Sequence, residues 1–134
     1  MLAVDTNVVV RLLVADDDEQ HARARHLFAT RTLWVPVTVV LETEWVLRSA
    51  YGFSPDAIGT AISGLVRLAN VTVESSDAVT FAVEALSKGI DFADALHLAS
   101  AAAATEGLAT FDAKLVHRVR QHYPHLVVST PDGS

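Results

Sequence analysis

The sequence predicts a single α/β domain in which a central parallel β-sheet of about five strands is flanked by helices. The length of 134 residues fits one domain, and a hydrophobic content of 51% is enough to bury a substantial core. Short apolar runs alternate along the chain with longer segments of helical spacing. Most of these runs are uninterrupted, as expected for strands covered on both faces.

The predicted elements alternate regularly from the start of the chain. The strand candidates are Leu2 to Val4, Leu33 to Val37, Val71 to Val73, Leu108 to Phe111 and Leu126 to Val128. The segments with helical spacing are Asp17 to Thr30, Thr38 to Ala50, Pro55 to Leu68, Asp77 to Ser87, Phe92 to Thr105 and Ala113 to His122. Ser54 and Pro55 form a helix start, while Gly52, Gly89 and Gly107 follow helix ends. Repeated strand, helix, strand units predict a parallel sheet with right-handed crossovers. We expect residues 1–130 to form the domain and residues 131–134 a flexible tail.

Composition excludes several classes of function. The absence of cysteine excludes disulfides, thiolate chemistry and cysteine-based zinc sites. Sixteen acidic residues against ten basic ones, a net charge of -6, argue against a protein that coats nucleic acid by bulk electrostatics. Any RNA contact must therefore be local. Asp5 interrupts the first apolar stretch too early for a signal peptide, so we expect a soluble, cytoplasmic protein.

Asp5 and Asp112 each come directly after a predicted strand. Asp5 ends the first strand and Asp112 follows the fourth. The carboxyl ends of parallel strands share one edge, where open α/β sheets bind ligands, and the two strands are neighbours if the fold is doubly wound. We therefore expect both carboxylates at that edge. Each could instead cap the helix that follows it.

Glu42 lies one turn into the helix after the second strand, which places it at the same edge. Its neighbour Glu44 has a partner in Arg48, four residues later, whereas Glu42 has only Trp45 and Val46 at helical spacings. We expect the Glu42 carboxylate on a mostly buried helix, where a cation or hydrogen bonds must offset its desolvation. The alternative is an exposed glutamate beside Glu44.

Asp91 and Asp94 stand at the start of an alanine-rich helix. They have the spacing of a capping box, which is a structural explanation for each of them. The rest of this helix is small and apolar, which predicts burial against the sheet. Asp94 is then an acid near the amino end of a buried helix, close to the carboxyl edge of the strands.

Four carboxylates at one sheet edge would repel one another strongly without a bound cation. Oxygen ligands without cysteine favour a hard divalent ion, so we expect Mg²⁺, with Mn²⁺ as a substitute, in a site suited to a phosphate. Zinc bound by histidine is the weaker alternative, because none of the six histidines forms a metal-binding pair at this edge.

Four motifs resemble those of PIN-domain proteins, specifically the VapC-type toxins of bacterial and archaeal toxin–antitoxin pairs. They are VDTNVVVRLL, VVLETEWVLRSAYGFS, DFADALHLA and ATFDAKL, in the order and spacing of that family. Each motif alone is weak, but four in order are specific, and the resemblance covers essentially the whole chain.

The resemblance implies a metal-dependent endoribonuclease that hydrolyses RNA phosphodiesters and inhibits translation. The residues it implies as catalytic groups and metal ligands are Asp5, Glu42, Asp94 and Asp112. Asn7 and Thr110 fall at supporting positions, from which they would bond to the acids or to water at the site. It also implies a homodimer and a small antitoxin partner that enters the acidic groove. Because water would be the nucleophile, the products should carry 5′-phosphate and 3′-hydroxyl ends.

Several other residues have two possible roles each. Arg11, Arg48 and Arg118 are either phosphate contacts or solvated surface arginines. His97 is expected as a hydrogen-bonded core histidine rather than a catalyst. The apolar residues around Trp45 and the segment Ala57 to Leu68 are expected in the core, although part of them could serve a dimer or antitoxin contact.

Two other classes of function stay open. A small-molecule phosphate-ester hydrolase would also use a carboxylate-lined edge, but such enzymes usually need a second aspartate two residues after the first, and Asn7 stands there. A noncatalytic metal-binding module that acts through a protein partner is the other possibility. An Asp94→Asn variant separates it from an enzyme.

Overall fold

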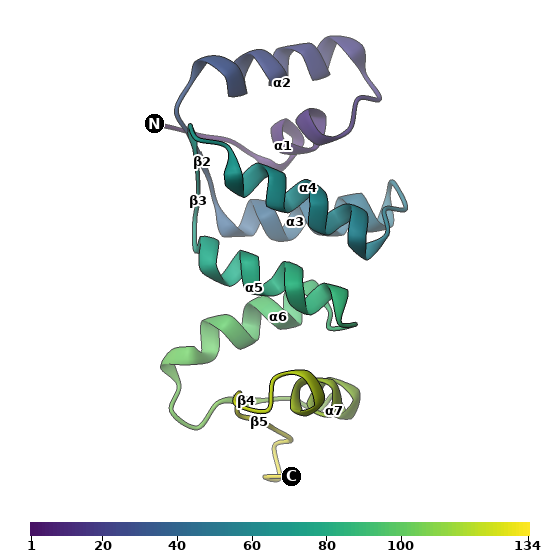
Figure 1. Cartoon of the computed structure of the whole chain (residues 1–134), viewed down its shortest axis with the longest axis vertical. Helices are drawn as coiled ribbons and strands as arrows, with labels where there is room; N and C mark the ends of the chain where they lie inside the picture. The colour runs from purple at the N-terminus through teal and green to yellow at the C-terminus, as the bar shows by residue number, and fades with distance from the viewer.

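The computed structural model describes residues 1–134 as an elongated α/β molecule in which the helices lie one below another (Figure 1). The strands are β1 (Leu2–Ala3), β2 (Leu33–Val35), β3 (Val71–Val73), β4 (Leu108–Ala109) and β5 (Val128–Ser129). The helices are α1 (Thr6–Leu13), α2 (Asp18–Thr30), α3 (Val37–Ser49), α4 (Pro55–Arg67), α5 (Ser76–Ser87), α6 (Phe92–Ser100) and α7 (Ala113–His122), with a 3₁₀ turn η1 (Ala101–Ala103).

The five strands form two sheets, so the expectation of one five-stranded sheet is wrong. All pairs are parallel, as predicted: β1, β2 and β3 pair in that order, and β4 pairs with β5. Helices α5 and α6 pack closely against each other and lie between the two sheets (Figure 1). The outer edges of β1 and β4 therefore stay unpaired.

The three-stranded sheet is covered on one face, in contrast to the expectation of two covered faces. Leu33, Val35 and Val71 are buried, while Thr72 is exposed and Leu2 is 38% exposed. The alternation follows from the period of two along a strand.

Helix starts follow the capping residues seen in the sequence. Ser54 accepts a hydrogen bond from the Ala57 amide at the start of α4, and Asp17 accepts one from Gln20 at the start of α2. The alanine-rich helix α6 is shorter than predicted, because its last residues form the 3₁₀ turn instead. Intrinsic helix propensity, which favours alanine, does not by itself fix where a helix ends.

The second sheet is attached to the rest of the molecule through α7. The Tyr123 ring lies 4.9 Å from that of Phe81 on α5, and Lys88 lies 4.7 Å above the Tyr123 ring. Leu115, Val116 and Val119 of α7 belong to the same core cluster as the buried residues of the first sheet. One continuous core thus joins both sheets.

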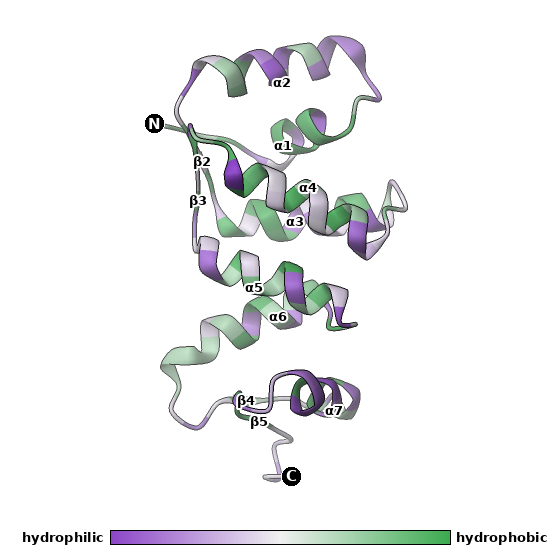
Figure 2. Ribbon diagram, in the orientation of Figure 1, coloured by the Kyte–Doolittle hydropathy of each residue, from purple (hydrophilic) through white to green (hydrophobic).

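Hydrophilic residues concentrate on α2 and α7, as Figure 2 shows. Ala24 and Phe28 are the buried residues of α2, which is otherwise largely solvated. None of the helices has both the length and the apolar character needed to cross a membrane.

Candidate active site

The first group of candidate residues lies where β1 and β2 lead into α1 and α3. Asp5 caps α1 by accepting a hydrogen bond from the Val8 amide at 3.1 Å. The hydroxyl of Thr6 donates to Glu42 Oε1 at 3.0 Å, which joins α1 to α3. Asp5 is thereby connected to Glu42 through Thr6, the next residue in the chain. Sequence reasoning missed Thr6, although a hydroxyl directly after a candidate acid is a signal for such a contact.

Glu42 is exposed and its neighbour Glu44 is buried, the reverse of the predicted environments. Glu44 is 2% exposed and accepts hydrogen bonds from Arg48, the closer one at 2.9 Å. The pairing of Glu44 with Arg48 is confirmed, but the argument that desolvation marks Glu42 is wrong. Glu42 and Glu44 are two positions apart on a helix, so their side chains point about 200° apart. When packing buries one of them, the other faces solvent.

The second group of candidate residues lies at the starts of α6 and α7. Asp91 caps α6 through the Asp94 amide at 3.2 Å. Asp112 caps α7 by accepting hydrogen bonds from Lys114 and Leu115, at 3.0 and 3.1 Å. Thr110 Oγ1 accepts a hydrogen bond from the Asp112 amide at 3.0 Å, which fixes the turn before α7.

Asp94 is the member of this second group whose environment disfavours the charged form of its carboxyl. Burial raises the pKa of its carboxyl, and the charges of Asp91 and Asp112 raise that pKa further. His97, one turn later on α6, acts on this pKa in the opposite direction. His97 itself is exposed, so the expected core histidine is a surface residue.

The structure does not gather the four predicted acids into one cluster. Thr6, the residue after Asp5, donates to Glu42, and the charge of Asp112 acts on the carboxyl of Asp94. No group of three or more histidine, aspartate or glutamate side chains is close enough to hold a metal ion. Asn7 is exposed and makes no hydrogen bond to the acids, whereas Thr110 contacts the backbone of Asp112.

The donor chemistry of these residues fits a hard divalent cation. Capping occupies a single carboxylate oxygen of Asp5 and of Asp112, so the second oxygen of each is free for a ligand. No lysine or arginine pairs with Asp94. A cation there would offset both the burial of Asp94 and its repulsion from Asp112.

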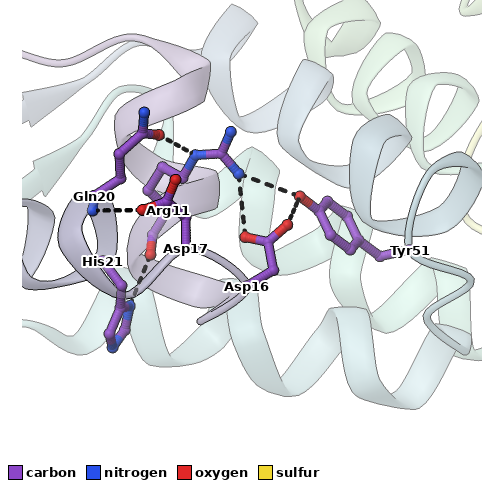
Figure 3. Close-up of polar contacts among 6 residues, drawn as sticks. All are labelled: Arg11, Asp16, Asp17, Gln20, His21 and Tyr51. Carbon is purple, nitrogen blue, oxygen red and sulfur yellow. Dashed lines mark hydrogen bonds and ion pairs between the residues drawn. The ribbon is translucent and has the colours of Figure 1, made fainter.

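The three arginines that were considered as phosphate contacts all have partners within the chain. Arg48 pairs with Glu44, and Arg118 donates a hydrogen bond to the Gly89 carbonyl. Arg11 donates to Gln20 and to Asp16, and also to the Tyr51 hydroxyl (Figure 3). Each therefore has a structural role, and the arrangement around Arg11 is the most extensive of the three.

Comparison with known protein families gives one match. The chain matches the model of the PIN domain over residues 2–120, which include all four candidate acids. A search among characterised proteins gives no match. PIN domains are generally nucleases, and such nucleases generally use divalent metal ions. Since the matched residues make up most of its length, the chain belongs to the PIN domain family.

Proposed function

We propose that this protein is a metal-dependent endoribonuclease that hydrolyses RNA phosphodiesters. The observation that carries the proposal is Asp94, a partly buried carboxylate whose pKa is raised by burial and by the charges of Asp91 and Asp112, with no basic side chain bonded to it. Such an arrangement is unfavourable in the chain alone and becomes favourable with a cation and a phosphate. The PIN domain match gives the class of reaction.

Asp94 and Asp112 are the residues that would hold Mg²⁺, or Mn²⁺ in its place. Asp5 and Glu42 complete the site if the carboxyl ends of β1 and β4 come together. A divalent cation supplies activation of water and neutralisation of charge on the phosphate. Hard oxygen donors of this kind are those that Mg²⁺ prefers.

The surrounding residues hold these carboxylates in position. The hydrogen bond from Thr6 limits the rotation of the Glu42 side chain, and capping of α1 limits that of Asp5. Thr110 and the two amides of α7 do the same for Asp112. A preorganised carboxylate loses less side-chain entropy when it binds a ligand. Asn7 is assigned a supporting role, through a hydrogen bond to the acids or to water at the site.

The test is cleavage of total RNA and of purified transfer RNAs with Mg²⁺, with Mn²⁺ or with EDTA. Asp94→Asn is compared with Asp56→Asn, an exposed aspartate in the first turn of α4 that lies outside the site. We expect discrete, metal-dependent cuts with the parent and with Asp56→Asn, and none with Asp94→Asn. Products with 5′-phosphate ends support attack by water, and 2′,3′-cyclic phosphates contradict it. Folded Asp94→Asn that cleaves as the parent does would refute the assignment of Asp94.

We further propose that the protein acts as the toxin of a type II toxin–antitoxin pair and inhibits translation, as a homodimer with an antitoxin partner. The resemblance of its four motifs supports this role, together with an apolar groove of about 510 Å³ that Leu12, Phe28 and Leu68 line. A helix of the antitoxin fits a groove of this character. Growth arrest on expression, relieved by Asp94→Asn, tests the role, and light scattering after size-exclusion chromatography tests the dimer.

A further inference from the structure

A second groove lies on the other side of α2, between α1 and α2. Its volume is about 330 Å³, and its polar lining residues are Asn7, Arg11, Gln20 and Arg23. Apolar residues such as Val8 and Leu27 complete its walls, and no carboxylate lines it. A groove with two arginines and no acid stands out in a protein with a net charge of -6.

Arg11 is held rigidly at one end of this groove. Its Nε donates to Gln20 at 2.5 Å, and its Nη1 donates to Asp16 at 3.1 Å and to the Tyr51 hydroxyl at 3.4 Å. Tyr51 in turn donates to the other Asp16 oxygen at 2.8 Å. Figure 3 shows the Gln20 contact on one side of the guanidinium and the Asp16 and Tyr51 contacts on the other. The second terminal nitrogen, Nη2, has no partner in the chain and is available to a ligand.

Arg23 supplies the charge that this network leaves uncompensated. It is exposed, and it forms neither an ion pair nor a hydrogen bond with another residue. Asp16 pairs with Arg11, so Arg23 is the basic lining residue whose charge has no partner. A fixed guanidinium beside a free one suits a phosphate, whose oxygens accept hydrogen bonds from several directions.

The groove is connected to the candidate active site through α1. Asn7, which lines the groove, follows Asp5 by two residues in the first turn of this helix. Arg11 is four residues further on, about 6 Å along the helix axis. A ligand in the groove therefore extends from the turn that Asp5 caps toward the last turn of α1.

We propose that this groove binds a backbone phosphate of single-stranded RNA, next to the phosphodiester that is cleaved. The choice of RNA as the ligand rests on the proposed function. Arg23 and Arg11 Nη2 contact the phosphate oxygens, while Asn7 contacts the adjoining sugar or base. Tyr51 and Asp16 are positioning residues, because they fix Arg11 without lining the groove themselves.

The test measures binding of a short, fluorescently labelled single-stranded RNA by anisotropy over a series of salt concentrations. The Asp94→Asn protein with Mg²⁺ serves as parent, so that cleavage does not interfere. Arg23→Ala is compared with Arg25→Ala, which removes the same charge from the same helix but lines the apolar groove on its other side. Arg25 likewise has no partner in the chain.

We expect Arg23→Ala to weaken RNA binding about 3- to 10-fold and to lower the salt slope by roughly 0.7, the value for one phosphate contact on a single strand. Arg25→Ala should stay within about twofold of the parent. Tyr51→Phe, which keeps the net charge, should weaken binding without changing the slope, as expected for a positioning role.

Equal effects of Arg23→Ala and Arg25→Ala on RNA binding would overturn the proposal that the groove binds RNA, since they would reflect only the change in net charge. A parent that binds no RNA at any salt concentration would also overturn it. RNA binding that depends on Arg23, in a protein without metal-dependent cleavage, would support the groove and refute the nuclease. Cleavage of RNA combined with unchanged binding by Arg23→Ala would leave the nuclease intact and refute the groove alone.

Discussion

At the scale of single residues, the notable feature of Asp94 is that burial and neighbouring charge act in the same direction. Both raise the pKa of its carboxyl above the usual value of 3.8. The charged form therefore opposes folding when no cation is bound. This opposition is absent below the pKa of the unfolded chain, grows as the pH rises through the folded pKa, and is complete above it.

Replacing Asp94 by Asn should accordingly stabilise the metal-free protein. In EDTA at neutral pH we expect Tm to rise by about 1 to 3 °C, and the difference should vanish as the pH falls below about 3.8. Mg²⁺ should reverse the order, because it stabilises a protein in which Asp94 is a ligand. Thermal melts with and without Mg²⁺ measure both effects. A lower Tm for Asp94→Asn in EDTA would contradict this account.

The pair of Glu44 and Arg48 gives a second prediction at this scale. Glu44 is buried, whereas the Arg48 side chain is 46% exposed. Arg48→Ala should lower the free energy of unfolding by about 2 kcal/mol, because a buried carboxylate then lacks its cation. Glu44→Gln combined with Arg48→Ala should be less destabilising than Arg48→Ala alone, since no buried charge remains unpaired. Denaturant titrations of the parent and the two variants decide this, and a double variant less stable than Arg48→Ala would contradict it.

The sequence identified the candidate acids but could not assign their environments. Asp5, Asp91 and Asp112 are helix caps, and a cap and a ligand both require an acid at the same position. The geometry allows both roles for Asp5 and Asp112, since one oxygen serves the cap. The exchange of Glu42 and Glu44 between surface and interior depends on the rotation of α3, which tertiary packing determines.

At the scale of elements, the contact of β4 with β5 depends on one glycine. Gly107 has a φ of +82°, and a Cβ placed there would lie 2.2 Å from the Val127 carbonyl oxygen. The two strands are then joined by hydrogen bonds from Leu108 to Val127 and from Thr110 to Ser129. A side chain at position 107 would thus strain the backbone and separate these strands.

Gly107→Ala should destabilise the protein by about 2 kcal/mol or more, and hydrogen exchange at the Leu108 and Thr110 amides should accelerate. Gly52→Ala is the matched control, because Gly52 also has a positive φ, of +67°, but has open space around its Cβ position. That variant should lose only about 1 kcal/mol, from the backbone conformation alone. Equal losses in both would show that the close approach to Val127 is unimportant.

The positions of helices and strands were easier to predict than the pairing of the strands, for a physical reason. Helices α2, α4 and α7 begin within a residue of their predicted starts, because their caps are local signals. The strands are two or three residues long, and their partners lie far away in the sequence. No local pattern determines which edge of β4 meets which edge of β1, so the division into two sheets could not be predicted.

At the scale of the whole molecule, the two sheets divide the candidate acids. Asp5 and Glu42 belong to the end with β1 and β2, while Asp94 and Asp112 belong to the end with β4. If all four share one cation, the unpaired edges of β1 and β4 must approach each other. The absence of cysteine makes this approach measurable with engineered thiols.

A variant with Ala3→Cys in β1 and Ala109→Cys in β4 should form a disulfide faster with Mg²⁺ than with EDTA. Both positions are exposed, so neither substitution disturbs the core. Gel mobility under nonreducing conditions reports the bond and separates a bond within one molecule from one between two. Addition of Asp94→Asn should remove the effect of Mg²⁺. A rate independent of Mg²⁺ would argue that the four acids do not gather around one ion.

The unpaired strand edges also bear on the colloidal behaviour of the protein. An edge strand presents free amide and carbonyl groups to any other chain that approaches it. Leu2 beside one edge and Phe111, 89% exposed beyond the other, add an apolar attraction to this backbone template. We therefore expect any strand addition in concentrated solutions to begin at these two edges, opposed by the repulsion between molecules of net charge -6.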